Sequence, residues 1–298
     1  MVAMLGDAMI YLVGLALRYW LWAANVAGDR PEVFGYFTAF VILHTAKEGC
    51  KPTCRDSHFP QVATPLNSYR RLTEGVHMYK AGLAPYQGVI FHETPLALAV
   101  FSVLQGPYVH WLFLLGDLLT AVCLARLGKV VAQQRLVQQE AERRGYSKEA
   151  QPLLATISAT LNAHRSMALA FLLNPYIIAN CAAMTSTVWA NLLLAIFLLS
   201  LVSGWRIAAC ISLAFATYQS LYPVLLLLPL ILHLTKRLES REEKMQQTVA
   251  IVSIFLFTLA LLILLSAEIC GDWSFLGATY GFILSVPELT PNMGIFWY

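Results

Sequence analysis

Long apolar stretches alternate with shorter polar ones along most of this chain. Residues 8–27 form the first apolar stretch, and residues 108–127 and 248–267 form two more. About 20 helical residues span the ~30 Å hydrocarbon core of a bilayer, so each stretch is long enough to cross a membrane. The first stretch has neither a basic segment before it nor a small-residue cleavage site. We therefore expect a retained signal anchor at the N-terminus.

Four shorter apolar segments follow, and prolines interrupt them. These segments are residues 166–183, 187–203, 206–222 and 223–235. Proline removes a backbone donor and kinks or ends a helix. Within a membrane, such irregular backbone persists only where it faces protein or a wet cavity. The pattern predicts an all-α fold, a polytopic transmembrane helical bundle with short and proline-broken helices, in a single multi-pass domain over residues 1–298.

Two charged segments predict how the chain is oriented. Residues 128–165 are rich in Arg and Lys, and residues 236–247 hold four bases and three acids. Short basic loops remain in the cytosol, so we expect both segments there, with an even number of crossings between them. Residues 28–93, which contain five prolines, and residues 268–298 would then be lumenal.

The composition excludes several classes of protein. Of the 298 residues, 58% are hydrophobic and 12% are charged, against roughly 45–50% and about 25% in soluble domains. The mean hydropathy is +0.62. Twenty bases and seventeen acids cannot cover a surface of this size, so most of it must face lipid. A cytosolic enzyme, a nucleic-acid-binding protein and a disordered linker are all excluded.

The sequence contains no recognisable catalytic or metal-binding constellation. It lacks a Gly-x-Ser-x-Gly elbow, and no cysteine has papain-like or caspase-like flanks. His92 and Glu93 begin like a zinc-protease motif, but Leu96 stands where the second histidine is required. A looser set of soft ligands comprises His44, Cys50, Cys54 and His58. This spacing is a weak metal signal, so we predict neither a metal nor a cofactor.

Arg18 and Asp117 are ionisable residues within predicted crossings. Charges at membrane depth are costly and face the bundle interior, a water-filled cavity or a partner of opposite charge. The two residues could pair with each other or with a lipid headgroup. A structural ion pair inside the bundle is the favoured interpretation.

Four sequence blocks together go beyond composition. They read APYQGVIFHETPL from residue 84, LLNPY from residue 172, ATYQSLYP from residue 216 and YGFILSVPELTPNMGIFWY from residue 280. In these blocks the chain resembles the U subunit of the glycosylphosphatidylinositol (GPI) transamidase, the phosphatidylinositol-glycan class U family, over residues 65–298. Members of that family continue past the equivalent of Tyr298, so we expect a C-terminally truncated form.

The resemblance implies a multi-pass protein of the endoplasmic reticulum membrane that lacks catalytic residues of its own. Its implied partners are the GPI lipid and the other transamidase subunits, including a caspase-like subunit that carries the catalytic thiol. Its implied role is to bind or present the GPI lipid, or the attachment-signal peptide.

The segment 85–96 is also similar to membrane-embedded mannosyltransferases that use a lipid-phosphate donor, which implies a C-type glycosyltransferase scaffold. A GPI-pathway mannosyltransferase is therefore the alternative function. Those enzymes carry paired acids near the position of Asp29, whereas Asp29 and Glu32 here lie three residues apart. An architectural subunit without a lipid site is a further alternative.

For the lipid we expect a groove between the broken helices, apolar in its depth and hydrogen-bonding at its lumenal end. The candidate contacts are Tyr86, His92, Glu93, Asn174, Gln219, Tyr222, Pro287 and Asn292. Helix packing and turn formation are the alternative role for each of them.

Overall fold

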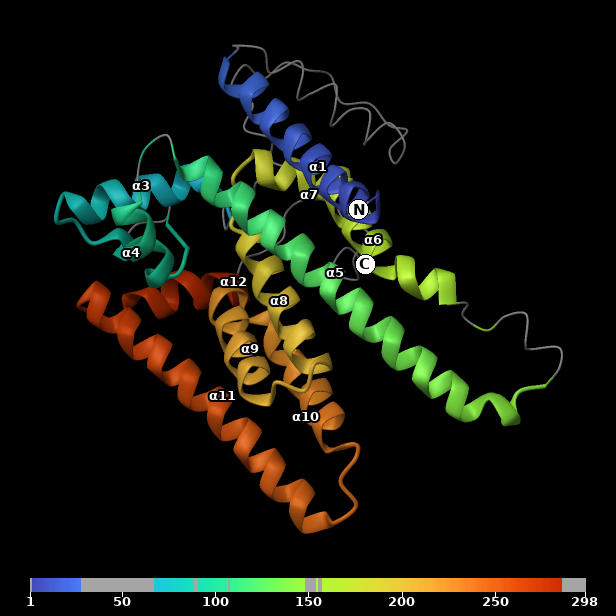
Figure 1. The fold of residues 1–298 in the computed structure, drawn as a ribbon. Helices are drawn as coiled ribbons and strands as arrows, with labels where there is room; N and C mark the ends of the chain where they lie inside the picture. Colours follow the sequence, from blue (N-terminus) through green and yellow to red (C-terminus); the bar gives the residue numbers. More distant parts are fainter. Residues whose placement is uncertain are drawn as a thin grey trace, which may run out of the picture.

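A computed structural model describes residues 2–27, 67–87, 91–104, 106, 108–147, 154 and 157–285. Within this part of the chain every regular element is helical, which confirms the predicted all-α fold. The long helices α5 (Val109–Glu142) and α11 (Arg241–Cys270) diverge across the molecule, and shorter helices fill the space between them (Figure 1). Both long helices have the length and hydropathy needed to cross a membrane.

The two long helices contain the predicted crossings at residues 108–127 and 248–267. Helix α5 does not end at residue 127 but continues to Glu142. The segment that follows residue 127 is rich in Ala, Gln, Leu and Glu, which favour helix. The start of the basic segment 128–165 is therefore a continuation of the crossing helix, while its cytosolic side stays a prediction.

Prolines break the helices at the predicted places. The elements around these breaks are α6 (Ile157–Leu172), α7 (Pro175–Ala182), α9 (Arg206–Ser220), the 3-10 helix η4 (Tyr222–Leu226) and α10 (Leu227–Thr235). At the first break Asn174 Oδ1 accepts a hydrogen bond from the backbone N–H of Tyr176, at 3.0 Å. Pro175 occupies the first position of α7, where an amide donor is not needed. These breaks confirm the expected short, proline-interrupted helices.

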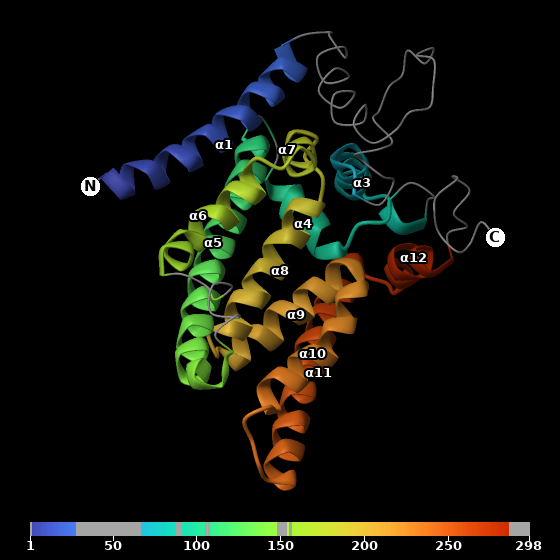
Figure 2. The same ribbon diagram turned by 90° about the vertical axis from the view of Figure 1, so that its right-hand side faces the viewer.

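The remaining elements surround the long helices. They are α1 (Val2–Ala27), α3 (Tyr69–Lys80), η1 (Pro85–Gln87), α4 (Pro95–Val103), η2 (Arg143–Gly145), α8 (Thr187–Val202), the π-helix η5 (Leu276–Gly281) and α12 (Phe282–Ser285). Helix α8 packs on α5 and α9, and α9 packs in turn on α11. Helix α1 lies at the opposite end of the molecule from α11 and contacts α5, α6 and α7 (Figure 2).

A small apolar cluster packs α7 on α1, and two larger ones hold most of the other described helices together. One gathers buried phenylalanines from several segments, among them Phe91, Phe101, Phe113 and Phe275. The other lies between α8, α9, α10 and α11, where α9 contributes small residues such as Ala209 and Ala214. Small side chains let membrane helices approach closely, because packing and not water exclusion drives their association. The outer face of α11 stays apolar and exposed at Phe257 and Leu264, as expected of a surface that faces lipid.

Candidate functional site

A cavity of about 580 Å³ opens between α3, α4, α5, α8, α9 and α11. Ligand pockets typically measure about 300–1,000 Å³, so this space suits part of a sizeable ligand. Most of its wall is apolar, formed by residues that include Leu72, Val100, Phe101, Leu104, Leu112, Phe113, Leu193, Phe215, Leu262 and Leu265. The cavity is therefore suited to an apolar guest.

A small group of polar residues interrupts this apolar wall. The group, here called the polar rim, consists of Asn67, Ser68, Glu93, Thr94, Ser186 and Gln219. Ser186 connects its members: its N–H donates to the Asn67 carbonyl at 3.0 Å, and Gln219 Nε2 donates to the Ser186 carbonyl at 3.1 Å. The Ser186 hydroxyl also donates to the Glu93 carboxylate. The rim is thus a hydrogen-bonded cluster that connects four separate segments of the chain.

Glu93 is the acidic member of the rim. It lies just before α4, outside the long crossing helices, and 7% of its surface is exposed. Burial raises the pKa of Glu93 to about 7, because desolvation disfavours the charged form, and the hydrogen bond from Ser186 opposes that rise in part. The Glu93 carbonyl accepts hydrogen bonds from the hydroxyls of Tyr86 at 3.0 Å and Thr279 at 3.4 Å. The backbone that carries this carboxyl is therefore held from two sides.

Tyr86 and His92 lie behind the cavity wall and are not among its lining residues. The Tyr86 ring is buried against Phe91, with centroids 5.1 Å apart. The His92 ring stacks on Phe282 at 3.7 Å, and its Nδ1 lies 2.7 Å from the carbonyl oxygen of Ala278. His92 therefore attaches the segment before α4 to the C-terminal elements η5 and α12, whereas Tyr86 packs within that segment.

Of the other five predicted contacts, one lines the cavity, two lie elsewhere and two fall outside the described residues. Gln219 lines the cavity together with Glu93, but Asn174 caps α7, and Tyr222 is 64% exposed at the start of η4. Pro287 and Asn292 fall outside the described residues. So do Asp29, Glu32 and the loose set of histidines and cysteines between residues 44 and 58. The structure brings two of the eight candidates to one cavity and places two more directly behind it.

Tyr218 is a lining residue that the prediction did not select, although it lies within the block ATYQSLYP. Its hydroxyl accepts the N–H of Leu96 at 3.2 Å and contacts the Ser266 hydroxyl at 2.5 Å. The Tyr280 hydroxyl donates to the Tyr218 carbonyl. Tyr218 therefore joins α4, α9, α11 and η5. Its position next to the selected Gln219, in a distinctive sequence block, is the signal that could have identified it.

Trp189 was also missed. Its ring lines the cavity and packs on Gly116 of α5, where an added Cβ would lie 3.2 Å from the ring. The indole Nε1–H is buried and has no hydrogen-bond acceptor among the described residues. An unpaired buried donor costs about 1–3 kcal/mol. The Trp189 ring thus forms part of the apolar wall, while its buried Nε1–H has no partner among the described residues.

Comparison with known protein families assigns this chain to one of them. The family described as GPI transamidase subunit PIG-U matches residues 40–298. The chain belongs to this family. That assignment confirms the resemblance seen in the four sequence blocks, and the matched range contains every cavity residue named above.

Named relatives support the same assignment. The chain is 36% identical over 247 residues to the GPI-anchor transamidase component PIGU of Homo sapiens, which covers 80% of this chain and 56% of that protein. The GPI-anchor transamidase component PIGU of Cricetulus griseus has the same identity and the same coverage of both chains. The GPI transamidase component GAB1 of Saccharomyces cerevisiae is 25% identical over 241 residues, with 80% and 53% covered. The chain thus spans little more than half the length of these relatives.

Within this member of the family, Arg18 and Asp117 form an ion pair with each other. Arg18 Nε lies 2.6 Å from Asp117 Oδ2, and both side chains are fully buried. Arg18 Nη1 also donates to the carbonyls of Gly14 and Leu172, each at 2.9 Å. Leu172 is the last residue of α6, so its carbonyl lacks a helical partner. The guanidinium therefore connects α1, α5 and the broken end of α6.

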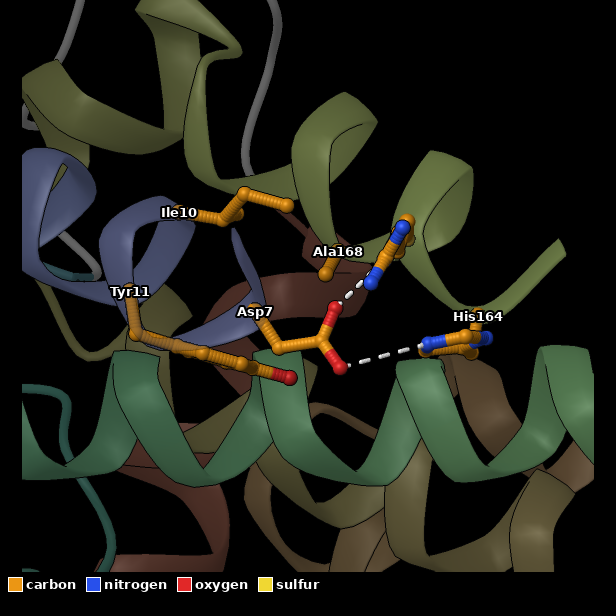
Figure 3. Close-up of a pocket in the computed structure, with 6 residues that line it drawn as sticks. Asp7, Ile10, Tyr11, His164 and Ala168 are labelled. Carbon is orange, nitrogen blue, oxygen red and sulfur yellow. Dashed lines mark hydrogen bonds and ion pairs between the residues drawn. The ribbon is translucent and has the colours of Figure 1, made fainter. Parts of the chain in front are cut away.

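A second, smaller cavity of about 120 Å³ lies between α1 and α6. Figure 3 shows Asp7 at its centre, pointing toward His164. Arg165 Nε lies 2.6 Å from Asp7 Oδ1, and His164 Nε2 lies 3.6 Å from Asp7 Oδ2. The hydrogen bond from Arg165 is the main reason that the pKa of Asp7 falls below its usual value. This cavity is smaller than a typical ligand pocket, and a partly exposed ion pair lines it.

Proposed function

We propose that this chain is a non-catalytic subunit of a GPI transamidase in the endoplasmic reticulum membrane, and that its large cavity holds part of the GPI lipid. The names of the relatives as transamidase components favour this function over the alternative mannosyltransferase. The observation that carries the lipid role is the cavity itself, with an apolar wall and a compact polar rim. An amphiphile needs both kinds of surface, side by side.

The described cysteines do not suggest a thiol nucleophile at the cavity. Cys181 and Cys210 are buried among helices, and neither belongs to the cavity wall. Covalent catalysis requires a nucleophile within reach of a base and of the substrate. In our proposal the cleaving thiol belongs to a separate, caspase-like subunit, and this chain positions the lipid. The attachment-signal peptide is the competing guest, because its apolar part could enter the same space.

Labelling with a photoactivatable GPI analogue tests the lipid role. We expect the label on this chain within the assembled complex, and we expect unlabelled GPI to compete better than a signal peptide. Labelling confined to neighbouring subunits would contradict the proposal and favour an architectural role. The experiment is done in microsomes from cells that express the tagged chain.

Two neighbouring leucines on α11 provide a matched pair of variants. Leu265 lines the cavity, whereas Leu264 does not and is 57% exposed. We expect Leu265→Trp to fill the space and lower labelling about tenfold, a difference of about 1.4 kcal/mol in binding. Leu264→Trp should leave labelling unchanged. Equal labelling of both variants, at equal expression and assembly, would place the lipid elsewhere.

A further inference from the structure

The described residues that line the large cavity include no lysine, arginine or histidine. Its ionisable groups are the carboxyl of Glu93 and the phenols of Tyr69 and Tyr218. The nearest bases along the chain are Arg70 and Arg71 of α3 and His92 before Glu93, and none of the three is a lining residue. A phosphate is normally held by a cation or by free backbone amides. The cavity wall supplies no cation for one.

Backbone amides at helix N-termini are the other usual phosphate site, and three described helices, α3, α4 and α8, begin beside this cavity. Helix α4 begins with Pro95, which has no N–H, and the next amide, that of Leu96, already donates to the Tyr218 hydroxyl. At the start of α8 the N–H of Ser186 donates to Asn67, and its hydroxyl bonds to the Glu93 carboxylate. These amides of α4 and α8 therefore have internal partners, and at α8 an ionised Glu93 would repel an anion. At α3 the amides of Arg71 and Leu72 donate to the Ser68 carbonyl.

The polar rim instead offers the groups that bind hydroxyls. The hydroxyls of Ser68 and Thr94 combine donor and acceptor capacity, as do the amides of Asn67 and Gln219. One N–H of each amide already donates within the protein, to Thr187 Oγ1 and to the Ser186 carbonyl. A hydroxyl group also both donates and accepts, so it is the natural partner for such a set.

Three aromatic rings, inclined to one another, line the cavity beside the rim. Trp189 lies 5.6 Å from Phe113, which in turn lies 5.9 Å from Tyr69, measured between ring centroids. All three rings line the cavity. Aromatic faces pack well against the apolar face of a saturated ring. The cavity thus combines aromatic surface for a ring with neutral groups for its hydroxyls.

We propose that the cavity recognises a polyhydroxylated ring of the lipid headgroup, a sugar or a cyclitol, and leaves the phosphate outside. This inference rests on the proposed lipid role and specifies which part of the lipid the cavity recognises. The phosphate then lies at the cavity mouth, where solvent or another subunit neutralises it.

Three lipids with identical acyl chains and the same photoactivatable group distinguish the possibilities. Phosphatidylinositol carries a cyclitol and a phosphate, a monoglycosyl diacylglycerol carries a sugar without phosphate, and phosphatidic acid carries phosphate alone. With the full chain in phosphatidylcholine nanodiscs, we expect at least one ring-bearing lipid to label cavity residues about tenfold more than phosphatidic acid. The stronger of the two ring-bearing lipids identifies the ring.

A variant that removes the charge of Glu93 changes lipid labelling in a way that a purely structural role of this residue would not. Glu93→Gln should raise labelling by phosphatidic acid severalfold, because the repulsive carboxylate is gone, and should narrow the difference in labelling between phosphatidic acid and the ring-bearing lipids. Glu74→Gln on the exposed face of α3 is the matched control, since Glu74 pairs with Arg70 away from the cavity and should change nothing.

The outcomes separate this inference from the function on which it rests. Labelling by phosphatidic acid that equals that of the ring-bearing lipids, or competition by inorganic phosphate, would overturn ring recognition and leave the lipid role intact. Absence of labelling by all three lipids and by the GPI analogue would overturn both.

Discussion

The two polar regions inside this molecule differ in charge and in how fully they are packed. At the junction of α1, α5 and α6, Arg18 and Asp117 are ionisable and fully buried, and they connect three helices directly. Around the large cavity the polar groups are neutral apart from Glu93, and space remains between the helices. Buried charge serves here to join helices, whereas the neutral rim borders the space that a ligand could enter. The following predictions test that division, from the largest expected effect to the smallest.

The largest effect is expected from separating the buried ion pair. Asp117→Asn leaves the Arg18 guanidinium buried without its counter-charge, which should lower the free energy of unfolding by about 3–5 kcal/mol. Denaturation in detergent micelles, followed by circular dichroism, measures this. Replacing both partners, as Arg18→Met with Asp117→Leu, should recover much of the loss. A single variant as stable as the original chain would contradict the structural role of the pair.

Glu93 should make the cavity region sensitive to pH. Its folded pKa of about 7 lies above the ordinary 4.5, so between these values the folded state keeps a proton that the unfolded state releases. Stability should therefore fall by about 1.4 kcal/mol per pH unit through this window and level off above it, about 3 kcal/mol lower in total.

Glu93→Gln removes that dependence and gives the measurement. The gap in apparent melting temperature between the variant and the original chain should widen in favour of the variant from pH 4.5 to pH 7. Other carboxyls titrate equally in both proteins and cancel in the comparison. A gap that stays constant over this range would show that Glu93 is not desolvated.

The hydroxyl of Tyr218 should contribute less than either carboxyl. Tyr218→Phe keeps the ring but removes the acceptor for the Leu96 N–H and the contact with Ser266. We expect a loss of about 1–3 kcal/mol, since a buried donor then lacks a partner. Thermal denaturation of the variant measures the loss. Tyr176→Phe, at an exposed ring, is the control and should be neutral.

The smallest effect is expected at the partly exposed pair of Asp7 and Arg165. Asp7→Asn should cost about 0–1 kcal/mol, because solvent screens such pairs. The lowered pKa of Asp7 means that its contribution is present above the ordinary value of 3.8 and is lost as the pH falls below it. Unfolding at low and high salt checks this, and a loss equal to that of Asp117→Asn would contradict the contrast between the two pairs.

The sequence allowed much of the fold to be predicted, because its signals are local. Apolar length located α5 and α11, and Asn174–Pro175 and Tyr222–Pro223 marked the helix breaks. The composition after residue 127 favours helix, but the sequence did not predict that α5 runs unbroken from the crossing to Glu142. The pairing of Arg18 with Asp117 could be anticipated because few charges occur at membrane depth.

The cavity could be predicted only in part. Glu93 and Gln219 were selected because they stand in distinctive blocks, but Asn67 and Ser186 stand in no such block. Their roles arise from tertiary contacts between segments far apart in the chain, such as the bond from Ser186 N–H to the Asn67 carbonyl. Tyr86 and His92 were chosen for their chemistry, whereas in the structure they position the backbone of Glu93.

The most direct test of the account is to map where a photoactivatable GPI analogue attaches to this chain, by mass spectrometry of its peptides. The account predicts attachment to cavity residues of α4, α9 and α11, such as Val100, Phe215 and Leu262. Attachment confined to the outer face of α11, at Phe257 and Leu264, would show that the lipid only surrounds the protein and would contradict a binding cavity.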